Sequence, residues 1–134
     1  MYEKRWQQRM QNFAKAFLQL KNAVKRNSED ILVQAGIIQT FEFTFELAWK
    51  TMKDKLEHEG FNVKNPRETI KQAFQADYIT EPSLWLDALD KRNLMAHTYE
   101  EDKAKEMVIL IKEKYFPVIE DLYAYLQQEL AKDL

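Results

Sequence analysis

The segment RNLMAHTYEED, residues 92–102, carries four polar side chains whose types can do chemistry: Arg92, Asn93, His97 and Tyr99. An arginine binds a phosphate through its planar fork and stabilises negative charge that develops there. A histidine titrates near neutral pH and can move a proton to or from a ribose hydroxyl or a leaving oxygen. RNA cleavage by attack of the 2′-hydroxyl needs these two groups and no metal ion, so the segment is compatible with that reaction.

The spacing of these residues limits how they can meet. Asn93 and His97 are four residues apart, so on a helix they are neighbours, and the amide can fix the orientation and tautomer of the imidazole. Arg92 shares a helical row with Trp85 and Leu89, and this row is otherwise expected to face the core. The five residues from Arg92 to His97 turn by about 140° around an ideal helix. We therefore expect either that the helix ends before His97 or that a two-fold dimer builds the site from two copies.

A structural role would explain the same residues, and this alternative stays open. A guanidinium on a core-facing row needs an anion or an open cleft, because an unpaired buried charge costs on the order of several kcal/mol. Arg92 can find that anion in Glu42 or Glu46 of the preceding long helix. His97 can then cap a helix C-terminus, and Tyr99 can be a half-buried aromatic residue.

Helical periodicity predicts the elements that position the segment. Apolar residues recur at spacings of three and four along most of the chain, which is typical of helices with one buried face. Asn27 and Ser28 are expected to cap the second helix, Gly60 to end it, and Asn65 and Pro66 to begin the third. The helices are expected at about residues 2–26, 29–58, 66–77, 82–97 and from about 100 onward.

The fold class follows from these elements and from the composition. No segment shows convincing alternation of period two, and Gly 2 and Pro 3 in 134 residues disfavour a turn-rich sheet architecture. The length predicts a single domain, residues 1–134. We expect an all-α fold, an up-and-down four-helix bundle with an extra short helix and a last helix kinked or divided at Pro117.

The composition also excludes several kinds of site. There is no cysteine, which rules out disulfides, thiolate zinc sites and cysteine nucleophiles. The two histidines, His58 and His97, are far apart, so we expect no histidine-rich metal site and no cofactor. A net charge of −2 disfavours a protein that binds nucleic acid over its whole surface, so any contact with RNA must be local. No apolar run approaches the ~20 residues of a membrane span, and no signal peptide is visible, so a cytoplasmic protein is expected.

Two stretches resemble a known family. The run Arg92-Asn-Leu-Met-Ala-His97-Thr-Tyr99 matches the Arg-x-x-x-x-His-x-Tyr signature of HEPN-domain proteins of the HepT type. The run FEFTFELAWKTMKDKL, residues 41–56, resembles a second signature, that of the subgroup known as nucleotidyltransferase substrate-binding proteins. The resemblance covers nearly the whole chain. It implies a helical bundle that forms a homodimer or higher oligomer.

The resemblance also implies a function and a partner. HepT-like members are metal-independent ribonuclease toxins, and an MntA-like nucleotidyltransferase antitoxin silences them by transferring AMP to the motif tyrosine. Carried over, Arg92 would hold phosphate, His97 would be the acid/base, Asn93 would orient it, and Tyr99 would accept AMP. The alternative is a non-catalytic subunit that binds the substrate or nucleotide of a two-component nucleotidyltransferase. The chain lacks the Gly-Ser turn and Asp-x-Asp pair of the transferase itself.

Overall fold

A computed structural model gives the fold and describes residues 4–97 and 101–132; within these ranges, the side chains of Ala96, His97 and Glu101 lie outside the description. Every regular element in the described part is helical, which confirms the predicted all-α class. In chain order the elements are α1 (Arg5–Ala23), α2 (Ile31–His58), α3 (Pro66–Gln75), α4 (Pro82–His97), α5 (Glu101–Leu110), the π-helical turn η1 (Ile111–Tyr115) and α6 (Phe116–Lys132).

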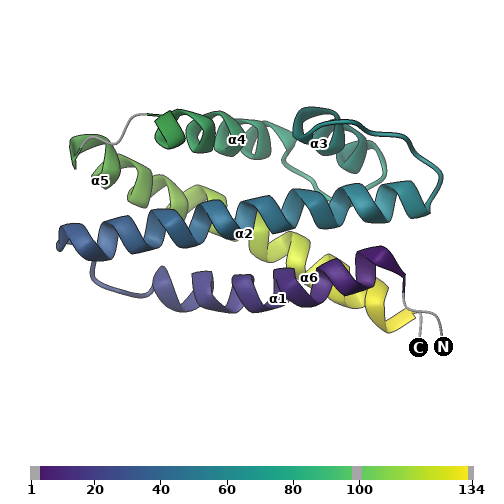
Figure 1. Cartoon of the computed structure of the whole chain (residues 1–134), viewed down its shortest axis with the longest axis horizontal. Helices are drawn as coiled ribbons and strands as arrows, with labels where there is room; N and C mark the ends of the chain where they lie inside the picture. The colour runs from purple at the N-terminus through teal and green to yellow at the C-terminus, as the bar shows by residue number, and fades with distance from the viewer. Residues whose placement is uncertain (1–3, 98–100, 133–134) are drawn as a thin grey trace.

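Helix α2 lies at the centre of the molecule. It contacts α1, α3, α5 and α6, and Figure 1 shows α1 and α6 on one side of it and α3, α4 and α5 on the other. The first turn of α1 and the last turn of α6 lie at the same end (Figure 1). Because α2 meets elements on both sides, its side chains can link residues that are far apart in the sequence.

The sequence predicts the C-terminal end of α2 correctly but not its N-terminal cap. Its N-cap is Asp30, whose carboxylate accepts a hydrogen bond from the Leu32 backbone N–H at 2.7 Å. The expectation that Asn27 and Ser28 cap this helix is therefore wrong, since the preceding residues form a loop in which Asn27 instead accepts from the Glu29 N–H. The reason is local: an aspartate directly before the first turn competes successfully for the cap position.

Gly60 ends α2 as predicted. Its φ of +98° lies in the left-handed region that favours glycine. The Gly60 N–H donates to the Glu57 carbonyl at 3.1 Å, and the Phe61 N–H donates to the Leu56 carbonyl at 2.9 Å. This pair of bonds is the Schellman motif, which satisfies carbonyls that the helix end would otherwise leave without donors.

The start of α3 also agrees with its prediction. Asn65 is the N-cap and accepts from the Glu68 N–H at 2.9 Å, and Pro66 occupies the first turn. The Glu68 carboxylate in turn accepts from the Lys64 N–H at 2.8 Å. The capping interactions thus fix where α3 departs from the loop that follows α2.

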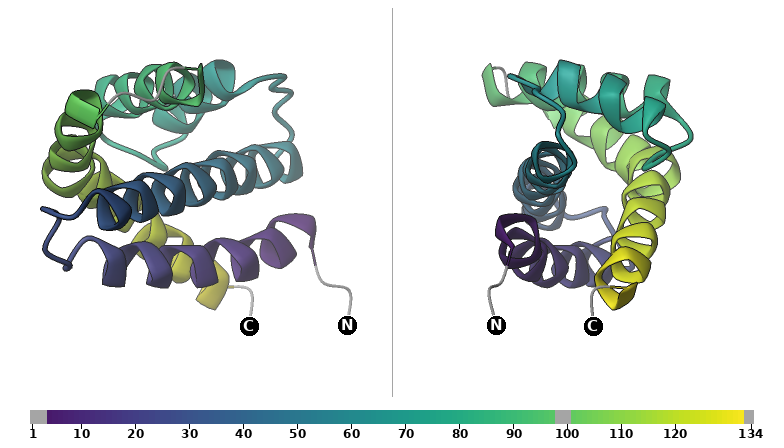
Figure 2. Two further views of the ribbon diagram at one scale, coloured as in Figure 1. Left: turned by 60° about the vertical axis from the view of Figure 1, so that its left-hand side comes forward. Right: turned by 90° about the vertical axis from the view of Figure 1, so that its right-hand side faces the viewer.

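The last helical run changes type directly before Pro117. A proline lacks the N–H that an α-helix would place against the carbonyl four residues earlier, and the π-helical turn η1 occupies that stretch of the chain. Figure 2 shows α5 and α6 running in different directions on either side of this turn. The prediction that Pro117 divides the last helix is consistent with this arrangement, although the sequence did not specify a π-helical turn.

A buried cation lies near the C-terminal end of α2. The side chain of Lys55 is only 5% exposed, and its Nζ pairs with Glu59 at 3.2 Å and with Glu129 of α6 at 3.3 Å. Three aromatic rings surround the same Nζ, with centroids at 4.6 Å for Tyr78 and at 5.6 Å for both Trp6 and Tyr125. Lys55 therefore connects α1, α2, α6 and the segment between α3 and α4.

Candidate functional site

Arg92 is held on α4 by the packing of its own helical row. Trp85 and Leu89, seven and three residues earlier, are 1% and 4% exposed, and the Trp85 ring lies 5.7 Å from that of Phe45 in α2. This contact fixes α4 against α2. The Arg92 side chain at the end of the row is 26% exposed, so the row passes from the core to the surface at this residue.

The guanidinium of Arg92 forms an ion pair with Glu46 of α2. Its Nη2 donates to the Glu46 Oε2, and the Glu46 side chain is 30% exposed. This partner is one of the two carboxylates that the structural alternative named. Because neither side chain is sealed from solvent, the pair lies at an accessible surface, where Arg92 can still meet a further anion.

Glu46 is itself fixed by two residues of its own helix. The indole Nε1 of Trp49 donates to Glu46 Oε2 at 3.1 Å, and the Nζ of Lys50 pairs with Glu46 Oε1 at 3.1 Å. Burial acts to raise the pKa of Glu46, but the bonds from Trp49 and Lys50 and the charge of Arg92 outweigh it and hold the pKa below its usual range. Glu46 is therefore ionised at neutral pH.

Glu42, one turn earlier on α2, behaves differently. Burial raises its pKa above the usual value, and the nearby Arg92 only partly offsets this effect. Glu42 is thus close enough to feel the charge of Arg92, while Glu46 makes the direct contact. The sequence assigns no role to Trp49 or Lys50, although their spacing of three and four residues from Glu46 is the signal that could have found both.

The other residues of the predicted motif have a more limited description. Asn93 is exposed on α4, and Leu94 beside it is 49% exposed. His97 is the last residue of α4, so the helix includes it rather than ending before it, while its side chain lies outside the described residues. Tyr99 also lies outside them. That Arg92, His97 and Tyr99 meet in one site therefore stays a prediction.

A second polar cluster lies on a different face of α4. The hydroxyl of Tyr115 donates to Asp87 Oδ2, and Lys91 donates to Asp87 Oδ1 at 3.2 Å. The hydrogen bond from Tyr115 is the main cause that lowers the pKa of Asp87, and burial together with this bond raises the pKa of Tyr115. The cluster attaches the π-helical turn to α4 and so steadies the helix that carries Arg92.

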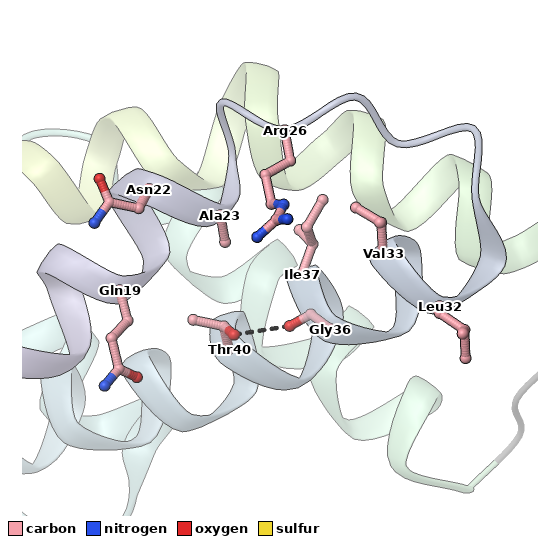
Figure 3. Close-up of a pocket in the computed structure, with 9 residues that line it drawn as sticks. All are labelled: Gln19, Asn22, Ala23, Arg26, Leu32, Val33, Gly36, Ile37 and Thr40. Atoms are coloured by element: carbon pink, nitrogen blue, oxygen red, sulfur yellow. Dashed lines mark hydrogen bonds between the residues drawn. The ribbon is translucent and has the colours of Figure 1, made fainter.

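The pocket on the helix that carries Arg92 is smaller than a pocket elsewhere in the molecule. A hollow of about 110 Å³ lies between α4 and α5, and Lys91, Met95 and Lys103 are among the residues that line it. A larger pocket, of about 530 Å³, lies instead between α1 and α2. Figure 3 shows the side chain of Arg26 pointing into this pocket, which Gly36 of α2 also lines. Neither Arg92 nor Asn93, the two motif residues whose side chains the structure describes, lines this larger pocket.

Two features are absent from the described residues. No group of three or more histidine, aspartate or glutamate side chains lies close enough together there to hold a metal ion. No described helix combines the length and apolar character that crossing a bilayer requires.

Comparison with known proteins identifies the family. The sequence profile of the nucleotidyltransferase substrate binding protein like family matches residues 8–128. The chain belongs to this family. A Haemophilus influenzae relative named probable ribonuclease HepT is 35% identical over 81 residues, which are 57% of this chain and 55% of the relative. The match thus spans about half the length of that protein.

Solved structures of the family fold agree with the helical arrangement. A Thermus thermophilus protein matches with a TM-score of 0.78 and 29% identity over 85% of this chain and 98% of its own. A Haemophilus influenzae protein, presented as revealing the fold of a substrate-binding domain of a nucleotidyltransferase, matches with a TM-score of 0.80 and 25% identity over 88% and 98%. The family fold therefore accounts for most of this chain.

Proposed function

We propose that this chain is a HepT-type toxin, a metal-independent ribonuclease that a partner nucleotidyltransferase silences. The observation that carries the proposal is the position of Arg92. Its helical row is anchored in the core at Trp85 and Leu89, yet its side chain is 26% exposed, and Asn93, the next residue, is exposed. The family membership and the relative named probable ribonuclease HepT support the same function.

The proposed reaction is transfer of a phosphoryl group within the RNA strand. The 2′-hydroxyl oxygen attacks the adjacent phosphorus, the bond to the 5′-oxygen breaks, and the products are a 2′,3′-cyclic phosphate and a free 5′-hydroxyl. Arg92 stabilises the negative charge on the phosphate oxygens. His97 moves the proton between the attacking and leaving oxygens, and Asn93 orients its ring.

The proposed silencing step modifies Tyr99. Its phenolic oxygen attacks the α-phosphorus of ATP on the partner nucleotidyltransferase, AMP is transferred, and pyrophosphate leaves. The phosphodiester that results adds negative charge two residues from His97. This charge would compete with the RNA phosphate for Arg92 and so block the site.

A homodimer belongs to the proposal because about 140° of helix separates Arg92 from His97. Pairing two chains about a two-fold axis can supply the arginine from one copy and the histidine from the other. The two helices that carry the Arg92–Glu46 pair also carry exposed apolar side chains: Phe43 is 57% exposed on α2 and Leu94 is 49% exposed on α4. Exposed apolar residues of this kind suit a contact between copies.

The test is cleavage of labelled RNA in the presence of EDTA. The wild type is expected to cleave, and Arg92→Ala and His97→Ala should each abolish cleavage while helix content and oligomeric state stay unchanged. Arg67→Ala is a matched control, because Arg67 pairs with an aspartate of α4, Asp90, at 2.8 Å but lies outside the motif. Loss of activity on chelation, or full activity in either motif variant, would contradict the mechanism.

A second function is favoured by one feature of the site. The Arg92 guanidinium already has a carboxylate partner in Glu46, as it would in a helical subunit that only binds a substrate for a nucleotidyltransferase. That function predicts a stable complex with a nucleotidyltransferase, no RNA cleavage, and no growth defect after induction. Growth arrest by the wild type but not by His97→Ala would decide for the ribonuclease.

A further inference from the structure

The contact between Arg92 and Glu46 leaves most of the guanidinium without a protein partner in the described residues. A guanidinium has five N–H donors in a planar fork, and Nη2 is the atom that bonds to Glu46. The contact engages one nitrogen with one carboxylate oxygen, whereas a phosphate prefers two parallel bonds along an edge of the fork. Since the Arg92 side chain is 26% exposed, part of it is accessible to such a ligand.

Glu46 is attached to α2 more firmly than a surface carboxylate normally is. The Trp49 Nε1–H and the Arg92 Nη2 donate to the same oxygen, Oε2, while Lys50 pairs with Oε1. Trp49 and Lys50 both come from the next turn of the same helix. The Glu46 carboxylate is therefore held in place relative to the α2 backbone. It holds in turn the guanidinium of Arg92, which lies 46 residues away in the sequence.

Glu46 shares its negative charge between two cations, Lys50 and Arg92. These three side chains carry a net positive charge, although the carboxyl group of Glu42 also lies close enough to interact with Arg92. A carboxylate that neutralised the arginine completely would oppose phosphate binding, but here it shares its charge with Lys50. The arrangement suits a carboxylate that orients the fork rather than one that occupies it.

We propose that Glu46, anchored by the Trp49 indole, is a positioning residue that holds the Arg92 fork with one edge directed to solvent for a phosphodiester. This inference rests on the proposed function, in which Arg92 binds the RNA phosphate. Fixing the fork in advance removes the cost of ordering a long side chain when RNA binds. The competing role is a gate, in which Glu46 blocks Arg92 and RNA must displace it.

Three variants separate the two roles. Glu46→Ala removes the carboxylate, Glu46→Gln keeps an oxygen that can accept from Arg92, and Trp49→Phe keeps the aromatic ring but removes its N–H. A positioning role predicts kcat reduced roughly 10- to 100-fold in Glu46→Ala, with smaller losses in Glu46→Gln and in Trp49→Phe. A gate predicts the reverse, an increase in kcat/KM or in affinity when the carboxylate is removed, and that result would overturn the proposal.

The matched control is Glu57→Gln. Glu57 forms the same kind of i,i+4 pair on α2, with Lys53, but lies about three helical turns beyond Glu46, so its substitution should leave kcat and KM unchanged. Equal losses in Glu57→Gln and Glu46→Gln would mean that any charge change on α2 has this effect. The proposal would then be wrong.

A double-mutant cycle shows whether Glu46 acts through Arg92. Binding of a 2′-O-methyl RNA, which cannot be cleaved, is measured for the wild type, Glu46→Ala, Arg92→Ala and the double variant. If Glu46 positions Arg92, its removal weakens binding in the wild type but has no effect once Arg92 is absent. An effect of equal size in both backgrounds would overturn the inference.

A readout without RNA keeps this inference separable from the proposed function. The ¹⁵N–¹H signal of the Arg92 Nε should be sharp in the wild type and should broaden or exchange faster in Glu46→Ala and Trp49→Phe. A wild type that cleaves no RNA would refute the ribonuclease, and this signal would still decide whether Glu46 orders the fork. A signal that is unchanged in both variants would refute the positioning role.

Discussion

Lys55 should contribute more to the stability of the fold than any exposed lysine of α2. Replacing it by methionine keeps a flexible chain of similar length but removes the charge that meets three aromatic rings and two carboxylates. A desolvated cation over aromatic rings is worth about 2 kcal/mol. Each of the partly exposed pairs with Glu59 and Glu129 adds up to about 1 kcal/mol.

Methionine would recover part of this loss. Burying the lysine ammonium group costs desolvation free energy, and a buried methionine has no such cost. Roughly half of the lost interaction energy should therefore be offset. We expect Lys55→Met to lower the free energy of unfolding by about 2 kcal/mol, out of the roughly 5–15 kcal/mol of an ordinary domain. For a chain of this length that corresponds to a decrease in Tm of about 8 °C.

The assay is urea unfolding followed by circular dichroism, with thermal unfolding as a second measurement. Lys53→Met is the matched control, because Lys53 is 28% exposed and pairs across one turn with Glu57, so its loss should cost less than about 1 kcal/mol. In a Glu129→Gln background, the cost of Lys55→Met should become smaller. If Lys55→Met were as stable as the wild type, the desolvation cost of the ammonium group would equal its interaction free energy with the aromatic rings and carboxylates. That result would refute the reasoning.

The remaining predictions concern the two glycines and the acid dependence of stability. Gly36→Ala should raise the free energy of unfolding by about 0.5–1 kcal/mol, because a Cβ there meets nothing within 4 Å and alanine favours the helix. Gly60→Ala should lower it by about 1 kcal/mol, since its φ is +98°; urea midpoints that move in the same direction for both would contradict this. The hydrogen bond from Lys132 and then the bond from Lys55 lower the pKa of Glu129 below its ordinary 4.5, so the stability that it contributes is complete above about pH 4.5 and is lost as the pH falls through its lower pKa in the folded chain. The stability difference between the wild type and Glu129→Gln should therefore shrink on acidification below about pH 4.5, and a difference that grew instead would refute this assignment.

The helix ends show why part of the fold can be predicted from sequence. Gly60, Asn65 and Pro66 determine local backbone geometry by their own chemistry, and all three have the roles that the sequence predicts. Asp30 shows the limit of this approach, because several residues near it are suitable caps. Which of them caps the helix depends on where the loop from α1 joins α2, and this is a tertiary property.

The candidate site was predictable to a similar extent. The core-facing row of α4 and an acidic partner for Arg92 follow from helical spacing, although the sequence offered Glu42 and Glu46 equally. Geometry selects Glu46 and adds Trp49 as its anchor. Lys55 could not have been recognised, because it lies in a strongly charged stretch, and its aromatic neighbours come from distant parts of the chain.

The π-helical turn at Ile111–Tyr115 accommodates one additional residue between α5 and α6. A π turn holds one residue more than an α turn, so it takes up that residue with little rotation of the helices on either side. If the same residues formed a regular α-helix instead, α5 would rotate by about 100° relative to α6. The buried face of α5, with Ala104 and Met107, would then turn away from α2. One residue in the last helical run therefore sets the angular position of the helix that directly follows the predicted motif in the sequence.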